Sequence, residues 1–292
     1  MHIKNPVEWF FAQFEATAEI GAAHPADYFA TPAEIAAAHG TPVIREIVYQ
    51  DLVNAIKAGI SDFAAARTDV VFLIMIYPVA ALVIAGVDAQ HALLPLLFPT
   101  ASGFALIGPL FAVGLYEMSR QRELTGTENY LDTFRVIRSP QIGEIALMGL
   151  ILIGLFLLWL AVAQAIFDLT LGGGAAVTVT GFIGAVLTTP GGWAMIIIGT
   201  AAGGVFAAGV LAISVVTFPL LLDRHVSLGT AIHTSSLAVR RNPVVLAQWG
   251  LIITAGLVLG SLPCFIGLVI VLPVLGHATW HLYRRLVKPV KI

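Results

Sequence analysis

The sequence contains few charged residues and a single cysteine. Charged residues make up 11% of the 292 residues, whereas 58% are hydrophobic, and soluble proteins average about 25% charged. A water-soluble fold could not bury that much apolar surface. The net charge of -2 provides no basic field for nucleic-acid phosphates, so nucleic acid is not expected as a partner. The lone Cys264 excludes an intrachain disulfide and a cysteine-based metal site.

Sequence motifs for common catalytic chemistry are also missing. The chain has no glycine-rich phosphate loop, no Gly-x-Ser-x-Gly elbow and no His-Glu-x-x-His pair. These absences disfavour an enzyme. In addition, no Asp, Glu, Lys or Arg lies in the middle of any long apolar segment. Because ion and proton pathways through membranes use such residues, an ion-coupled transporter is also disfavoured.

Long apolar segments dominate the rest of the chain. A helix needs about 20 mostly apolar residues to cross a hydrocarbon core of about 30 Å. The sequence predicts six spans, at about 70–87, 101–116, 145–167, 193–222, 244–261 and 265–283. We therefore expect an all-α, polytopic transmembrane helical bundle in residues 43–288. Acidic cytoplasmic N-terminal helices in residues 1–42 are expected to precede it.

The basic residues are distributed asymmetrically over these six spans. The predicted exterior connections, at 88–100, 168–192 and Pro263, contain none of the fifteen Lys and Arg residues. Cytoplasmic loops of membrane proteins carry the excess of Lys and Arg. The sequence thus predicts a lipid-embedded protein whose two termini and basic residues all lie in the cytoplasm.

Interfacial amphipathic helices are predicted on this cytoplasmic side. The clearest covers 43–67, with one apolar face formed by Ile44, Ile47, Val48, Leu52, Ile56, Ile60 and Phe63. Arg67-Thr68, Arg138-Ser139 and Arg241-Asn242 each place Arg and a capping residue before a predicted outward span. They indicate either a parallel pseudo-threefold repeat or the ordinary gathering of basic and capping residues at cytoplasmic span ends. The unequal spacing of the caps favours the second interpretation.

Two groups of residues are candidates for a site. His277 and His281 are four residues apart on the last predicted span, a spacing that suits two metal ligands or two structural hydrogen bonds. No second such pair exists to complete a metal site, which favours the structural role. The second group consists of charged residues at predicted cytoplasmic span ends, namely Glu117, Arg120, Arg138, Asp223, Arg224 and Arg241. They form either a charge cluster or separate interfacial anchors.

Several segments resemble a known family. Phe218-Pro219-Leu220-Leu221-Leu222-Asp223-Arg224, Arg241-Asn242-Pro243 and, most specifically, Gly276-His277-Ala278-Thr279-Trp280-His281 are similar to a proteobacterial family of inner-membrane proteins catalogued as a domain of unknown function. The similarity covers about residues 43–288. It implies a six-span protein of the bacterial inner membrane without an established activity. Some family members are labelled as cytochrome c oxidase subunits. A catalytic haem-copper subunit is excluded, because only His277 and His281 lie within a predicted span.

The preferred functional hypothesis is a non-enzymatic accessory, scaffold or assembly factor of an inner-membrane complex, with a respiratory oxidase as the complex that the family label implies. The acidic N-terminal helices are its expected partner-binding part, and no cofactor is predicted. One alternative is a channel or uniporter whose central cavity is lined by Thr200, Ser214, Thr217 and Gln248. The other is a metal- or haem-binding membrane protein that uses His277 and His281.

Overall fold

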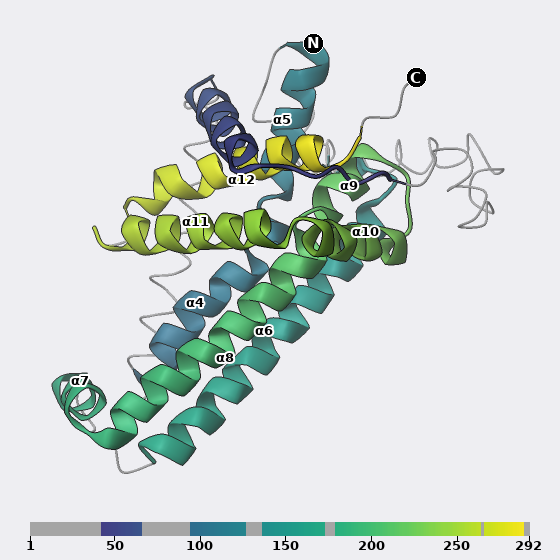
Figure 1. Ribbon diagram of the computed structural model, residues 1–292. Coiled ribbons are helices and arrows are strands. Elements are labelled where there is room, and N and C mark those ends of the chain that lie inside the picture. Colours follow the sequence, from purple (N-terminus) through teal and green to yellow (C-terminus); the bar gives the residue numbers. More distant parts are fainter. Residues whose placement is uncertain (1–41, 66–93, 127–135, 173–178, 264–265, 289–292) are drawn as a thin grey trace, which may run out of the picture. The chain divides into compact units, whose positions relative to one another are not determined.

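The computed structural model describes residues 42–65, 94–126, 136–172, 179–263 and 266–288 (Figure 1). The predicted helices of residues 1–42, apart from Pro42, and the predicted first span at 70–87 lie outside the described residues. The described residues are helical almost throughout, and among them we find no strand beyond the isolated antiparallel bridge between Ile44 and Val287. The prediction of an all-helical chain is therefore confirmed for this part of the protein.

The described helices begin with one that covers residues 49–65. The remaining helices are α4 (Leu94–Phe111), α5 (Val113–Thr125), α6 (Ile142–Thr170), α7 (Val179–Thr188), α8 (Pro190–Ser214), α9 (Thr217–Asp223), α10 (Leu228–Arg241), α11 (Pro243–Ser261) and α12 (Leu268–Leu286). A single 3₁₀ turn covers residues 136–138.

Among the described residues, four helical stretches are long and apolar enough to cross a membrane. They are Phe98–Thr125, Ile142–Thr170, Pro190–Asp223 and Pro243–Ser261, and they overlap the predicted spans at 101–116, 145–167, 193–222 and 244–261. The predicted span at 265–283 corresponds to the helix α12, which is not among the four candidate spans. The reason is that the second half of α12 contains two histidines and two arginines, which lower its hydropathy.

Two of the candidate spans each consist of two consecutive helices. The first is divided at Ala112 between α4 and α5, and the second is divided between α8 and α9, just before Pro219. Proline has no backbone N–H and its ring crowds the carbonyl of the preceding turn, so Pro219 favours the second break. Beside the second break, the backbone N–H of Val216 donates to Ser235 Oγ at 3.2 Å.

The helix α6 packs against both α4 and α8. Trp159 of α6 is 4% exposed and lies at the centre of this contact. Its Nε1 donates to the carbonyl of Pro99 at 2.9 Å, and its ring centroid is 5.5 Å from that of Phe206. On the opposite side of α6, Leu150 and Leu157 are 64% and 58% exposed. Such an apolar outer face is what a helix in contact with lipid requires.

A second group of segments lies at the end of the spans that carries the charged residues. Residues 43–47 run between the end of α12 and the junction of α10 with α11. Arg45 N donates to Leu286 O at 2.8 Å, and Lys288 N donates to Val43 O at 3.0 Å. Ile47 N donates to Asn242 Oδ1 at 2.8 Å. These bonds fix the chain just before the helix at 49–65.

The helix at 49–65 confirms the predicted apolar face only in part: Leu52 is buried, and Ile56 and Phe63 pack against buried clusters. Its most buried side consists of Leu52, Ala55, Gly59 and Asp62, whereas Val48 and Ile60 are 63% and 49% exposed. The reason is close backbone approach: a Cβ at position 59 would lie 2.6 Å from Ala278 N of α12. A stripe of small residues permits this contact, and large apolar residues would prevent it.

The predicted threefold repeat requires the same arrangement of residues before three spans. The structure describes two of these places, before α6 and before α11, and their capping residues form different hydrogen bonds. Ser139 Oγ accepts from Gln141 N at 3.2 Å. The Asn242 side chain makes no capping bond to α11 and instead binds the segment at 43–47. The third entry, at Arg67-Thr68, lies outside the described residues. The two caps therefore perform different tasks, and the repeat stays a prediction.

Candidate functional site

The side chain of Asp62 connects three segments through hydrogen bonds. This carboxylate is 4% exposed. It accepts from Ser119 Oγ of α5 at 2.6 Å, from Arg122 Nη1 of α5 at 2.8 Å and binds His281 Nε2 of α12 at 2.8 Å. We call Asp62, Ser119, Arg122, His277 and His281 the Asp62 network. It ties the helix at 49–65 to both α5 and α12.

His277 extends the network into the interior. Its Nδ1 lies 2.8 Å from Ser119 Oγ. Because the Ser119 hydroxyl gives its hydrogen to Asp62, Nδ1 must be the donor to that oxygen. The imidazole of His277 is 0% exposed, and its Nε2 has no hydrogen-bond partner in the described part of the chain. His277 and His281 thus lie on one face of α12, as their spacing predicted, and both are held by the Asp62 network.

The electrostatics of the network keep Asp62 ionised. Burial raises the pKa of this carboxyl, but hydrogen bonds from His281 and Ser119, with the charges of the two histidines, outweigh burial and leave the pKa below its ordinary value. Ser119 is 1% exposed and donates to a carboxylate. It therefore lacks the access that a nucleophilic serine requires.

The Asp62 network is not arranged as a metal centre. Across the described ranges, no group of three or more His, Cys, Asp and Glu side chains is placed to hold a metal ion. His281 uses Nε2, and His277 uses Nδ1, for bonds within the network. The arrangement is suited to holding helices together, which is the structural role considered for the two histidines.

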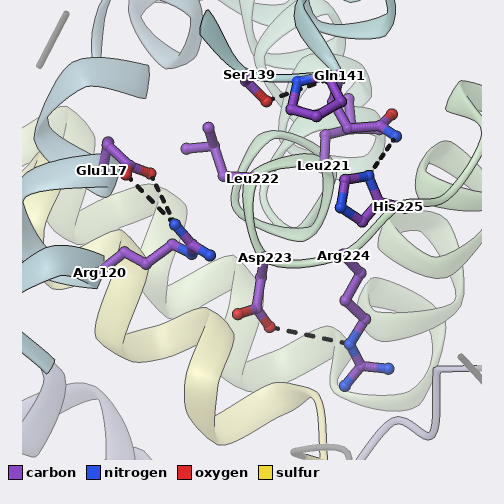
Figure 2. Close-up of a pocket in the computed structure, with 10 residues that line it drawn as sticks. Glu117, Arg120, Ser139, Gln141, Leu221, Leu222, Asp223, Arg224 and His225 are labelled. Carbon is purple, nitrogen blue, oxygen red and sulfur yellow. Dashed lines mark hydrogen bonds and ion pairs between the residues drawn. The ribbon is translucent and has the colours of Figure 1, made fainter. Parts of the chain in front are cut away.

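A cavity of about 180 Å³ lies beside the network at the ends of the spans (Figure 2). We call it the charged cavity. Its lining comes from α5, from the segment that leads into α6 and from the end of α9. The lining residues are Glu117, Arg120, Ser139, Pro140, Gln141, Leu221, Leu222, Asp223, Arg224 and His225.

The charges of the cavity are paired with each other and with neighbours. Arg120 Nη1 is 3.3 Å from Glu117 Oε1, and Gln121 Nε2 donates to the same oxygen at 2.6 Å. Asp223 accepts from Tyr283 Oη at 2.5 Å and from Arg284 Nη1 at 3.4 Å. These bonds connect α9 to α12, so the cavity wall is continuous with the layer that the Asp62 network stabilises.

Arg224 is 6% exposed and completes the polar wall. Its Nη2 donates to the carbonyl of Lys288 at 2.5 Å, and its Nε is 3.9 Å from Asp223 Oδ2. Figure 2 shows its guanidinium on the far side of Asp223 from Ser139 and Gln141. Arg224 thus contributes mainly to fixing the chain end against α9.

The structure brings together four of the six charged residues that the sequence singled out. Glu117, Arg120, Asp223 and Arg224 all line the charged cavity. Arg138 and Arg241 do not. Arg138 is exposed at the end of the 3₁₀ turn, and Arg241 donates from Nη1 to the carbonyl of Ile44 at 3.3 Å.

Sequence reasoning missed Asp62, Ser119, Arg122, Gln141 and His225 as members of these two sites. Only Asp62 carried a usable signal, because it is an acidic residue three positions after Gly59 on the helix at 49–65. The other four are polar or charged residues of a kind common at any span end.

The four residues proposed for a transport cavity are not brought together in the charged cavity. Ser214 Oγ and Thr217 Oγ1 donate to the carbonyls of Val210 and Ile213 in their own helical segment. Thr200 is exposed on α8, and Gln248 is half-buried on α11. The described residues therefore offer no specific support for transport.

Comparison with known proteins adds one finding. Residues 97–223 match a family described as "Predicted integral membrane protein (DUF2189)". No curated protein and no solved structure matches the chain. The matched residues contain three of the four candidate spans and most of the lining of the charged cavity. The match and the long apolar helices together indicate a multi-pass integral membrane protein whose function is unknown.

Proposed function

We propose that the protein is a non-enzymatic scaffold or accessory subunit of a complex in the bacterial inner membrane, with both termini in the cytoplasm. The observation that carries this proposal is the closure of the Asp62 network. The Asp62 carboxylate binds a hydroxyl and a guanidinium group of α5 and an imidazole of α12, so the bonds join three helices, and the serine of this arrangement is buried. The hydrogen bonds of these residues therefore hold the helices in place.

The proposed orientation rests on the distribution of charge along the described helices. Arg120, Asp223 and Arg224 lie around the charged cavity at the ends of two candidate spans, and Arg284 of α12 binds Asp223 at its edge. At the opposite end of α6 and through α7, no Lys or Arg occurs in the sequence. Basic residues mark the cytoplasmic side of a membrane protein, so the layer with the Asp62 network is assigned to the cytoplasm.

The proposed partner is another membrane complex. A rigid cytoplasmic layer and helices with exposed lateral faces would suit the binding of such a partner. In the candidate span Pro243–Ser261, only 17% of the apolar window is buried within the chain. Leu251 and Val258 on α11 are 68% and 55% exposed. Lipid covers such residues by default, and a neighbouring subunit could replace that lipid.

The test is co-purification from the source membrane in a mild detergent. Tagged full-length protein is compared with a variant that lacks residues 1–41, since the acidic N-terminal segment is the expected partner-binding part. We expect a defined set of membrane proteins in constant ratio with the full-length chain and a weaker set with the truncated one. Photo-crosslinking from position 251, with the buried Trp249 position as control, should reach the same partner. Recovery of the chain alone by both methods would refute the scaffold proposal.

A further inference from the structure

The charged cavity lies where three candidate spans leave the bilayer. Glu117 and Arg120 belong to the last turns of the span Phe98–Thr125, and Leu221, Leu222 and Asp223 end the span Pro190–Asp223. Ser139, Pro140 and Gln141 immediately precede the span Ile142–Thr170. A cavity at the common end of three spans is at the depth of lipid headgroups.

The cavity lining carries both signs of charge in balance. Arg120 and Arg224 are matched by Glu117 and Asp223. A site for a purely anionic group would be expected to have an excess of positive charge. A ligand with one anionic and one cationic group suits this lining better, because each of its charges meets an opposite one.

Hydrogen-bonding capacity remains unused on the lining residues. The Arg120 side chain is 29% exposed, and its two contacts with Glu117 are long, at 3.3 and 3.5 Å. Arg120 Nε and Gln141 Oε1 are buried and have no partner within the described residues. One is a donor and the other an acceptor, so these two lining residues keep one unused bond of each kind.

The size and surroundings of the cavity narrow the choice of ligand. A cavity of about 150 Å³ accommodates benzene, and the charged cavity of about 180 Å³ therefore suits a group slightly larger than benzene. Phosphoethanolamine has that size. The lining segment 139–141 is flanked in the sequence by two exposed apolar side chains, Ile137 at 66% and Ile142 at 40%, which are available to contact acyl chains.

We propose that the charged cavity binds the headgroup of a zwitterionic phospholipid that carries a phosphate and an ammonium group. Arg120 binds the phosphate, Glu117 binds the ammonium group, and the acyl chains remain in the bilayer beside α6. The proposal goes beyond the scaffold function and does not depend on it, since lipid binding is measured on the isolated protein.

The test is native mass spectrometry of the full-length protein after exchange into equimolar dioleoyl phosphatidylethanolamine and dioleoyl phosphatidylglycerol. We expect one phosphatidylethanolamine to be retained in preference to phosphatidylglycerol. Soluble glycerophosphoethanolamine, added in excess, should not displace it. Preference for phosphatidylglycerol, equal retention of the two lipids or displacement by the soluble compound would each overturn the proposal.

Two single-charge variants separate a binding role from a folding role. Glu117→Gln leaves a net positive lining and is expected to shift the preference toward phosphatidylglycerol. Arg120→Gln removes the phosphate ligand and is expected to weaken phosphatidylethanolamine retention by about tenfold or more. Arg240→Gln, on the exposed end of α10, is the matched control and should behave as wild type. Loss of folding cannot reverse a lipid preference, so an unchanged preference in folded Glu117→Gln protein would refute the assignment.

Discussion

Gly59 lies so close to Ala278 that a Cβ at position 59 would be 2.6 Å from the Ala278 backbone nitrogen and 2.8 Å from its Cβ. The helix at 49–65 and α12 therefore meet backbone to backbone. Asp62 follows Gly59 by one helical turn, and this approach brings its carboxylate within 2.8 Å of His281 Nε2. The close packing at Gly59 and the polar bonds at Asp62 are two parts of one helix contact.

The first prediction concerns this contact. Gly59→Ala should destabilise the protein by about 1–3 kcal/mol, because the added methyl group meets backbone atoms that cannot move aside as a side chain would. Thermal unfolding in detergent measures the effect. Gly229→Ala on α10 is the control, since nothing lies within 4 Å of a Cβ there, and it should stay within about 0.5 kcal/mol of wild type. Equal melting temperatures for the two variants would show that the helices do not pack closely.

The second prediction tests the charge at the centre of the Asp62 network. Asp62→Asn keeps the shape of the side chain but replaces one acceptor oxygen with an NH₂ group. In the wild type, Oδ1 binds Arg122 and Oδ2 binds Ser119 and His281. In either orientation of the amide, its NH₂ group therefore faces side chains that donated a hydrogen bond to Asp62. We expect a loss of about 1–3 kcal/mol in the free energy of unfolding.

The matched control for this exchange is Asp51→Asn in the same helix. Asp51 also binds an arginine, Arg285 Nη1 at 2.9 Å, but its side chain is 26% exposed. Ion pairs in contact with water contribute about 0–1 kcal/mol. A loss for Asp51→Asn as large as that for Asp62→Asn would contradict the central role of the Asp62 network.

The third prediction concerns pH. The pKa of Asp62 is lower in the folded protein than its ordinary value, because hydrogen bonds from His281 and Ser119 outweigh the opposing effect of burial. The unfolded chain then binds the proton more readily, so the stabilisation is complete above about pH 4, the ordinary range of an Asp carboxyl. It is lost as the pH falls through the lower folded-state pKa.

The measurement is the difference in unfolding free energy between wild type and Asp62→Asn from neutral pH downward. Below about pH 4 this difference should shrink as the pH falls. A difference that grows in this acidic range would mean that the folded-state pKa of Asp62 is raised, and would contradict the hydrogen-bonding scheme of the network.

The sequence predicted the candidate spans well, because length and hydropathy are local properties. The predicted span at 145–167 corresponds to Ile142–Thr170, and the one at 244–261 corresponds to Pro243–Ser261. The spacing of His277 and His281 also predicted correctly that they share a face of one helix. Each of these inferences used residues that are neighbours in the sequence.

The contacts between distant segments were not predictable in the same way. Asp62 meets Ser119 and His281 across sequence separations of 57 and 219 residues, and nothing local marks those partners. The buried face of the helix at 49–65 was predicted only in part, for a related reason. The count of large apolar side chains predicts that Ile60 is buried. In the fold Gly59 is buried instead, because a residue without a side chain lets the two helix backbones approach closely.

The fourth prediction concerns Asn242, which is 4% exposed. Its side chain accepts from Ile47 N at 2.8 Å and donates to the carbonyl of Arg45 at 3.0 Å. Asn242→Ala removes both bonds, so amide exchange at Ile47 should be faster by about tenfold or more. Hydrogen exchange with peptide mapping measures it. Asn54→Ala, whose side chain contacts only the exposed Gln50 among the described residues, should leave exchange at residues 43–47 unchanged.

The last prediction tests the membrane crossing and its direction through α6. This helix has 29 residues, and at 1.5 Å per residue it is about 43 Å long, more than the hydrocarbon core of about 30 Å. Ile137 just before it and Leu169 near its end are 66% and 87% exposed, so cysteines at the two positions should face opposite sides. In a Cys264→Ala background, a membrane-impermeant maleimide applied to intact spheroplasts should label Leu169→Cys and not Ile137→Cys. Permeabilised cells should show labelling of both. The reverse pattern in intact cells would invert the orientation, and labelling of both positions before permeabilisation would mean that α6 does not cross the membrane, because no water-filled path connects its two ends through a packed helical bundle.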